Sequence, residues 1–208
     1  MRSFRYFVFV AAVFAGLQFS AGAGAADQRS PGELAESFHD GLVGVMKEAK
    51  ALGIQGRYDA LLPLINGTFN ITLMAATVTA PYWRNGQADQ KAALVEASRG
   101  MSVATLATLF DGYSNEKFTV VRSRKSGKRI VVVDAEIRKS DGGIVKISYV
   151  VANTGGRWWI IDIVIDGGIS EIKKRRNEFV RILKEGGLAG LTGELTERTK
   201  ELLAGKRK

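Results

Sequence analysis

Several residue types that support catalysis or metal binding are absent or scarce in this chain of 208 residues. It has no cysteine, which excludes disulfide bonds, thiolate zinc sites, iron–sulfur clusters and cysteine nucleophiles. Its one histidine, His39, excludes a histidine-rich metal site and would have to serve any catalytic triad alone. The G-x-S-x-G, H-E-x-x-H and G-x-x-x-x-G-K-[ST] motifs do not occur. The composition therefore argues against an enzyme, a metal site and a cofactor.

Hydrophobic residues make up 46% of the chain and charged residues 25%, which is enough apolar material for a folded core. The formal net charge of +9 is compatible with an anionic partner. Nucleic acid is disfavoured as that partner, because no basic strand with interleaved aromatic residues is present.

Residues 1–26 have the three parts of a secretory signal peptide. Arg2 and Arg5 precede an apolar run, which is followed by small residues up to Ala26. The run is shorter than the ~20 residues that a membrane-spanning helix needs, so cleavage is favoured over an uncleaved anchor. We therefore expect residues 27–208 to form a single exported domain, located in the periplasm because the chain lacks disulfides and later apolar spans.

Two stretches of the remaining chain have helical periodicity. Ser30-Pro31-Gly32-Glu33 is a capping box, and the apolar stripe that follows predicts a helix to about Gly53, with His39 on its solvated side. Further helices are expected within 58–80, ended by Pro81, and over 89–110. After the strands, two more are expected, one from Ser170 to Gly186 and one from Leu188 onwards.

Between these stretches the hydrophobic period changes to two. Residues 118–124, 131–137, 145–151 and 159–165 are predicted strands, joined by short turns rich in glycine, serine, asparagine and aspartate. Trp159, Ile161 and Ile163 are assigned to one apolar face of the last strand. The predicted fold is α+β, with a four-stranded twisted antiparallel sheet wrapped by five or six helices.

Small residues over 100–110 would face large side chains of this sheet, and this arrangement can leave an apolar pocket. A fully packed core is the alternative. Arg175 and Arg176 interrupt the apolar stripe between Ile172 and Phe179, which would place them at the rim of an opening or on a solvated face. Asp162 and Asp166 could bracket a substrate as paired carboxylates, or simply lie on the wet face of the strand.

Three segments carry a resemblance to a known family: residues 162–170, Asn177-Glu178-Phe179, and residues 186–191. In this order, and with Leu61-Leu62-Pro63 and Tyr82-Trp83-Arg84 upstream, the chain resembles the MlaC family, also called the toluene-tolerance family. Residues 102–105 and 110–114 look more like its hopanoid-associated HpnM branch.

The resemblance implies a periplasmic lipid carrier without catalytic residues, whose cargo would be phospholipid or hopanoid. It would exchange that cargo with an inner-membrane lipid transporter and an outer-membrane lipid complex, needing no cofactor besides the bound lipid. The resemblance locates the pocket only as a region, so the lining residues are chosen by periodicity: Leu73, Met101, Leu106, Val133, Tyr149, Trp159, Ile161 and Phe179. Arg175 and Arg176 are the candidate contacts for a headgroup or a partner. A non-transporting adaptor of an envelope complex remains the alternative.

Overall fold

The computed structural model describes residues 29–206; the predicted signal peptide lies outside them. The helices are α1 (Pro31–Lys47), α2 (Ala49–Thr68), α3 (Ile71–Val78), α4 (Ala80–Asn85), α5 (Ala88–Leu109) and α6 (Glu171–Leu203). The strands are β1 (Lys117–Lys125), β2 (Ile130–Arg138), β3 (Ile144–Thr154) and β4 (Arg157–Ile165), in the spatial order β1-β2-β3-β4 with antiparallel neighbours. The predicted α+β fold class is confirmed. Over 29–206, no helix is both long and apolar enough to cross a bilayer.

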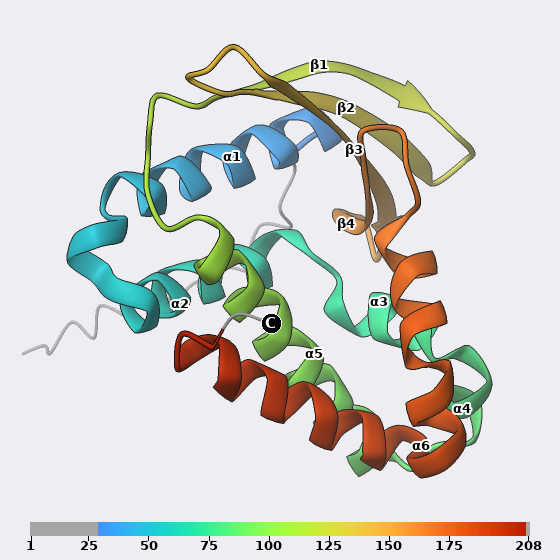
Figure 1. The fold of residues 1–208 in the computed structure, drawn as a ribbon. Helices are drawn as coiled ribbons and strands as arrows, with labels where there is room; N and C mark the ends of the chain where they lie inside the picture. The colour runs from blue at the N-terminus through green and yellow to red at the C-terminus, as the bar shows by residue number, and fades with distance from the viewer. Residues whose placement is uncertain (1–28, 207–208) are drawn as a thin grey trace, which may run out of the picture.

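The helices cover one face of the sheet in layers (Figure 1). The helix α1 lies directly against that face, and α5 and the second part of α6 lie farther from it. The short helices α3 and α4 lie at one side, next to the first part of α6. Among residues 29–206, no helix covers the opposite face of the sheet, and most of α6 lies away from the sheet.

Local sequence signals explain where α1 begins. Ser30 Oγ accepts from the Glu33 backbone N–H, and the Glu33 carboxylate accepts from the Ser30 N–H, so the predicted capping box is formed. The helix ends at Lys47, earlier than predicted, and Gly53 with φ 61° then kinks α2. Pro81 lies in the first turn of α4 instead of ending a helix.

The inner sheet face follows the predicted alternation in β2 and β3, where Val133, Tyr149 and Val151 are buried. It changes phase in β4. A β-bulge between Val150 and Val151 pairs Val151 with Ile160, and Ile161 is the extra residue. Ile160 is therefore the buried residue of β4, and the assignment of Trp159 and Ile161 to the inner face is wrong.

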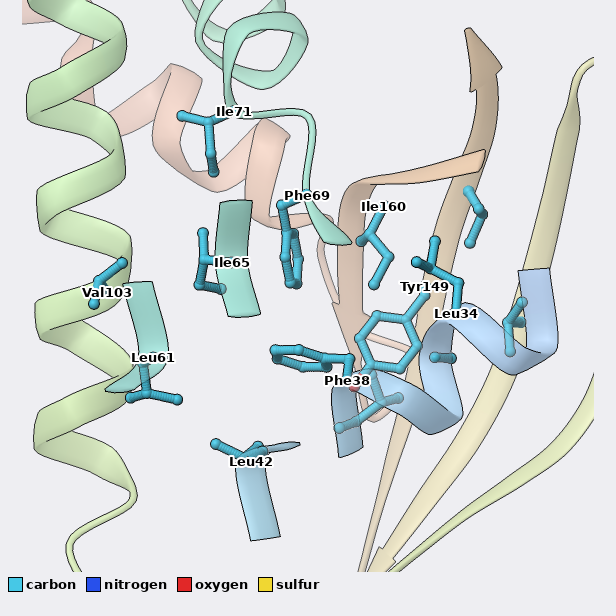
Figure 2. Packing of buried hydrophobic residues seen from close by; sticks show 14 of the residues in the cluster. Leu34, Phe38, Leu42, Leu61, Ile65, Phe69, Ile71, Val103, Tyr149 and Ile160 are labelled. Atoms are coloured by element: carbon cyan, nitrogen blue, oxygen red, sulfur yellow. The ribbon is translucent and has the colours of Figure 1, made fainter. Parts of the chain in front are cut away.

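Aromatic side chains join α1 to the sheet (Figure 2). The ring of Phe38 meets Phe69 edge-on with centroids 5.1 Å apart, and it meets Tyr149 edge-on at 6.2 Å. Leu34 and Leu42, one turn away on either side, are also buried. Helix α1 thus fills the inner face of the sheet with its own side chains.

A buried arginine connects α2 to α5. Arg57 is 8% exposed, and its Nε donates to the Ala107 carbonyl while its Nη1 donates to the Ala49 carbonyl, both at 2.8 Å. Ala107 lies in the last turn of α5, where unpaired carbonyls and the negative end of the helix dipole favour a cation. The guanidinium therefore joins the start of α2 to the end of α5.

Replacing Arg57 with methionine should lower the free energy of unfolding by ~2–3 kcal/mol, because two charge-assisted hydrogen bonds are lost and buried carbonyls stay unpaired. Urea unfolding followed by circular dichroism measures this change. Arg181→Met is the matched control: its side chain is 77% exposed and pairs only with Glu185, so it should change the same quantity by less than ~0.5 kcal/mol. Equal losses for the two variants would contradict the assigned role.

Candidate functional site

The chain has a narrow apolar slot between α3, α5 and α6, which we call the α3–α5–α6 slot. Its apolar lining consists of Ile71, Met74, Ala75, Val78, Leu94, Ile172, Phe179, Leu191 and Leu195. Ser98, Ser102, Thr79 and Arg175 complete the lining. The Ser102 hydroxyl donates to the Ser98 carbonyl within α5 at 2.8 Å, so it needs no other acceptor. The slot therefore presents an almost entirely hydrophobic surface.

In this conformation the slot is nearly closed, with a volume of about 40 Å³. That is close to the room that one water occupies in the liquid, whereas sites for small organic ligands measure ~300–1,000 Å³. To hold a molecule with acyl chains, the slot would have to grow roughly tenfold in volume, and this requires its helices to move apart. Met74 is a side chain suited to such a change, because its unbranched thioether adopts many shapes.

The parts of α6 before and after Gly187 both contribute side chains to the lining of the slot. The backbone is not helical at Gly187, whose φ of 58° and ψ of −152° suit glycine, so α6 consists of two helical limbs that meet there, in agreement with the predicted break at Gly186–Gly187. Phe179 comes from the first limb and Leu191 from the second. Arg198 of the second limb pairs with Glu178 of the first, which holds the limbs together. A second hollow of about 350 Å³ lies beside the kink, between α4 and Gly186–Ala189.

Residues 173–176 at the start of α6 are all basic, and two of them, Arg175 and Arg176, have different roles. Arg175 lines the slot, with its side chain 26% exposed and its Nε 3.6 Å from a Glu171 carboxylate oxygen. Arg176 donates from Nη2 to the Thr77 carbonyl at 2.8 Å, in the last turn of α3. One arginine thus places a cation at the slot, and the other links α6 to α3.

The predicted lining residues do not form one site. Val133 and Tyr149 belong to the core between the sheet and α1, and Leu106 packs against that core. Phe179 belongs to a second core around α6, which Met101 contacts. Leu73 is half-buried on α3. Of the eight, only Phe179 lines the slot.

Trp159 lies on the outer face of the sheet. Its cross-strand partner is Ala152, and the Arg157 guanidinium stacks on its ring at 3.9 Å from the centroid. Ile161 occupies the bulge. A prediction that assumes strict alternation along the whole strand misplaces both residues, because the bulge shifts the alternation.

His39 is 3% exposed, so the expectation of a solvated histidine is wrong. Its Nε2 lies 2.9 Å from the Tyr149 hydroxyl, between α1 and the inner face of the sheet. Burial lowers the pKa of His39 to about 4, against a smaller raising effect of Asp40, and burial also raises the pKa of Tyr149. The pair is a neutral hydrogen bond within the core.

The carboxylates considered for hydrolysis both bind backbone groups. Asp162 Oδ1 accepts from the N–H of Ile163 at 2.8 Å and from that of Ile172 at 3.1 Å, which joins β4 to the first turn of α6. Asp166 Oδ1 accepts from the Lys146 N–H at 2.8 Å. Within residues 29–206, no group of three or more histidine, aspartate or glutamate side chains is placed to hold a metal.

The profile of the family described as MlaC protein matches residues 36–197. A search of curated protein sequences gives no match. Among solved structures, the fold is similar to a phospholipid-binding protein from Ralstonia solanacearum, determined in complex with a phospholipid. The two chains are 18% identical with a TM-score of 0.74, and the alignment covers 84% of this chain and 99% of the other.

The stability of the fold should depend on pH through His39. In the unfolded chain this imidazole takes up a proton near pH 6.5, whereas in the folded protein it does so at about pH 4. Between these values the unfolded state binds more protons, so acidification should remove on the order of 3 kcal/mol of stability. Urea unfolding at pH 7.5, 5.5 and 4.5 measures this loss.

His39→Gln is the informative variant, because an amide can still hydrogen-bond the Tyr149 hydroxyl but does not titrate. The difference in unfolding free energy between the two proteins should shrink or reverse as the pH falls, since only the wild type loses this contribution. A difference that stays constant from pH 7.5 to 4.5 would show that His39 is not buried in its neutral form.

Proposed function

This chain belongs to the MlaC family, and from that premise we propose that it is a periplasmic lipid carrier. Its cargo is a phospholipid or a hopanoid, which it moves between an inner-membrane transporter and an outer-membrane complex. The observation that carries the proposal is the α3–α5–α6 slot, an apolar cleft between three helices with a cation in its lining. The Ralstonia solanacearum protein with the same fold, determined with a phospholipid, adds support for this class of cargo.

The physical demand on such a carrier is large. A lipid with ~30 chain methylenes, at ~0.8 kcal/mol each, costs on the order of 20 kcal/mol when exposed to water. The carrier must cover nearly all of that surface, and the 40 Å³ slot becomes large enough only when its walls part. In our proposal the angle between the two limbs of α6 changes at Gly187, and the chains enter the slot beside Phe179.

Arg175 gives the slot a preference among headgroups. Its guanidinium is half-buried beside apolar side chains, where a phosphate is a better partner than water or the 3.6 Å contact with Glu171. An anionic headgroup would therefore rest at this end of the slot while the chains lie inside.

The alternative is an adaptor that organises an envelope complex and binds no lipid. The small slot favours the adaptor on one point, since its volume of about 40 Å³ holds no acyl chain. Native mass spectrometry and lipid extraction of the full chain, exported to and purified from the periplasm, separate the two. Lipid bound at near one per chain, identified as phospholipid or hopanoid by its mass, supports the carrier. Protein that is free of lipid and takes none from vesicles supports the adaptor.

A slot-blocking substitution should stop uptake without unfolding the protein. Ser98→Phe places a ring in the slot from α5, and we expect it to reduce bound lipid at least roughly fivefold while far-UV circular dichroism is unchanged. Ala93→Phe adds the same ring on the exposed side of α5 and should leave the lipid content at the wild-type value. Equal lipid content in both variants would place the cargo elsewhere.

Removing the cation should change which lipid is carried. After incubation with vesicles of equal phosphatidylglycerol and phosphatidylcholine, Arg175→Gln should lower the ratio of bound anionic to zwitterionic lipid at least roughly twofold. Arg181→Gln, on the same limb but 77% exposed, should keep the wild-type ratio. An unchanged ratio in Arg175→Gln would remove this residue from the headgroup site.

A further inference from the structure

The turn between β1 and β2 concentrates positive charge at one end of the sheet. Arg124, Lys125, Lys128 and Arg129 lie within six consecutive residues, and all are exposed; we call them the basic tip. Residues 121–130 contain no acidic residue. The tip is thus a cluster of four cations on long, solvated side chains.

Asp134 pairs with Arg122 and with Arg124, the member of the basic tip nearest to the body of the sheet. Asp134 accepts from Arg122 Nε at 2.8 Å and from Arg124 Nε at 3.2 Å, and it also accepts from the Ser148 hydroxyl at 2.7 Å. Glu33, on the helix packed beneath, is engaged in the capping box of α1. Among the described residues, no carboxylate lies within ion-pair distance of Lys125, Lys128 or Arg129.

The other end of the same sheet has no excess of positive charge. There Lys117, Arg138 and Lys139 lie among Glu116, Glu136 and Asp141, so cations and acids are equal in number. The β1–β2 turn and the β2–β3 turn lie at opposite ends of the sheet (Figure 1). The excess charge is therefore a property of one hairpin and not of the sheet as a whole.

We propose that the basic tip is the surface by which this protein contacts anionic bilayers. Protein interfaces are enriched in aromatic residues at their buried centre and depleted in lysine, whereas the turn contains only serine and glycine beside its cations. A lipid surface needs no shape complementarity, and each lysine or arginine near its negative charge adds to the attraction. The contact holds the protein at the membrane without burying apolar side chains. Added salt shortens the Debye length and screens the attraction, so it should release the protein.

Sedimentation with vesicles of 30% phosphatidylglycerol in phosphatidylcholine tests the proposal on the full mature chain. Wild-type protein should sediment at low salt and stay in solution at 0.5 M NaCl or with pure phosphatidylcholine. The triple variant Lys125→Gln, Lys128→Gln, Arg129→Gln should lower the partition coefficient roughly 100-fold. The matched control Lys117→Gln, Arg138→Gln, Lys139→Gln removes the same charge at the other end of the sheet and should lower it by less than about fivefold.

Three outcomes would overturn the proposal. Equal losses in the two triple variants would mean that net charge alone drives binding, and no loss in either would place the contact elsewhere. A tip variant that binds vesicles normally but no longer binds poly-glutamate beads would point to an acidic protein surface instead. Ser98→Phe should sediment like the wild type, so a chain that carries no lipid can still pass this test, and docking is judged separately from lipid uptake.

Discussion

The contact of α1 with the inner face of the sheet determines where a ligand can bind in this molecule. Phe38 lies between Phe69 and Tyr149, and the hydrogen bond between His39 and Tyr149 pairs two polar groups that are buried there. With that face filled, the α3–α5–α6 slot lies one layer away from the sheet. The position of the slot follows from what the sheet has already buried.

The slot is nevertheless connected to the sheet through α6. Asp162 of β4 accepts from the Ile172 N–H, and Ile172 is itself part of the slot lining, so the end of the sheet sets the position of the first limb. The kink at Gly187 then directs the second limb back along α5, and the Arg198–Glu178 pair closes the angle. Because the limbs meet at one glycine, the lipid uptake that we propose needs a change in that angle and no change in the core beneath the sheet.

The sequence was sufficient for most of the secondary structure because periodicity is a local property. The capping box at Ser30 and the alternation in β2 and β3 depend on neighbours along the chain, and both are confirmed. The errors at His39 and Ile161 have another origin. His39 is buried because Tyr149, 110 residues away, supplies its partner, and Ile161 is displaced by a bulge that cross-strand pairing creates. Predicting the slot requires the same long-range information. The helical stripe identifies Phe179, but no sequence signal links it to the lining residues on α3 and α5.

The positive charge of the chain illustrates why composition alone could not assign a partner. Arg57 is a buried cation that donates hydrogen bonds to two backbone carbonyls at helix ends. Arg176 does similar work between α6 and α3 at a more exposed place, and Arg175 meets the apolar slot. At the basic tip, Lys125, Lys128 and Arg129 pair with no carboxylate among the described residues. Basic side chains thus have three roles in this chain: some stabilise the fold, one borders the slot, and some remain available to an external anion. The neighbours of each cation determine its role.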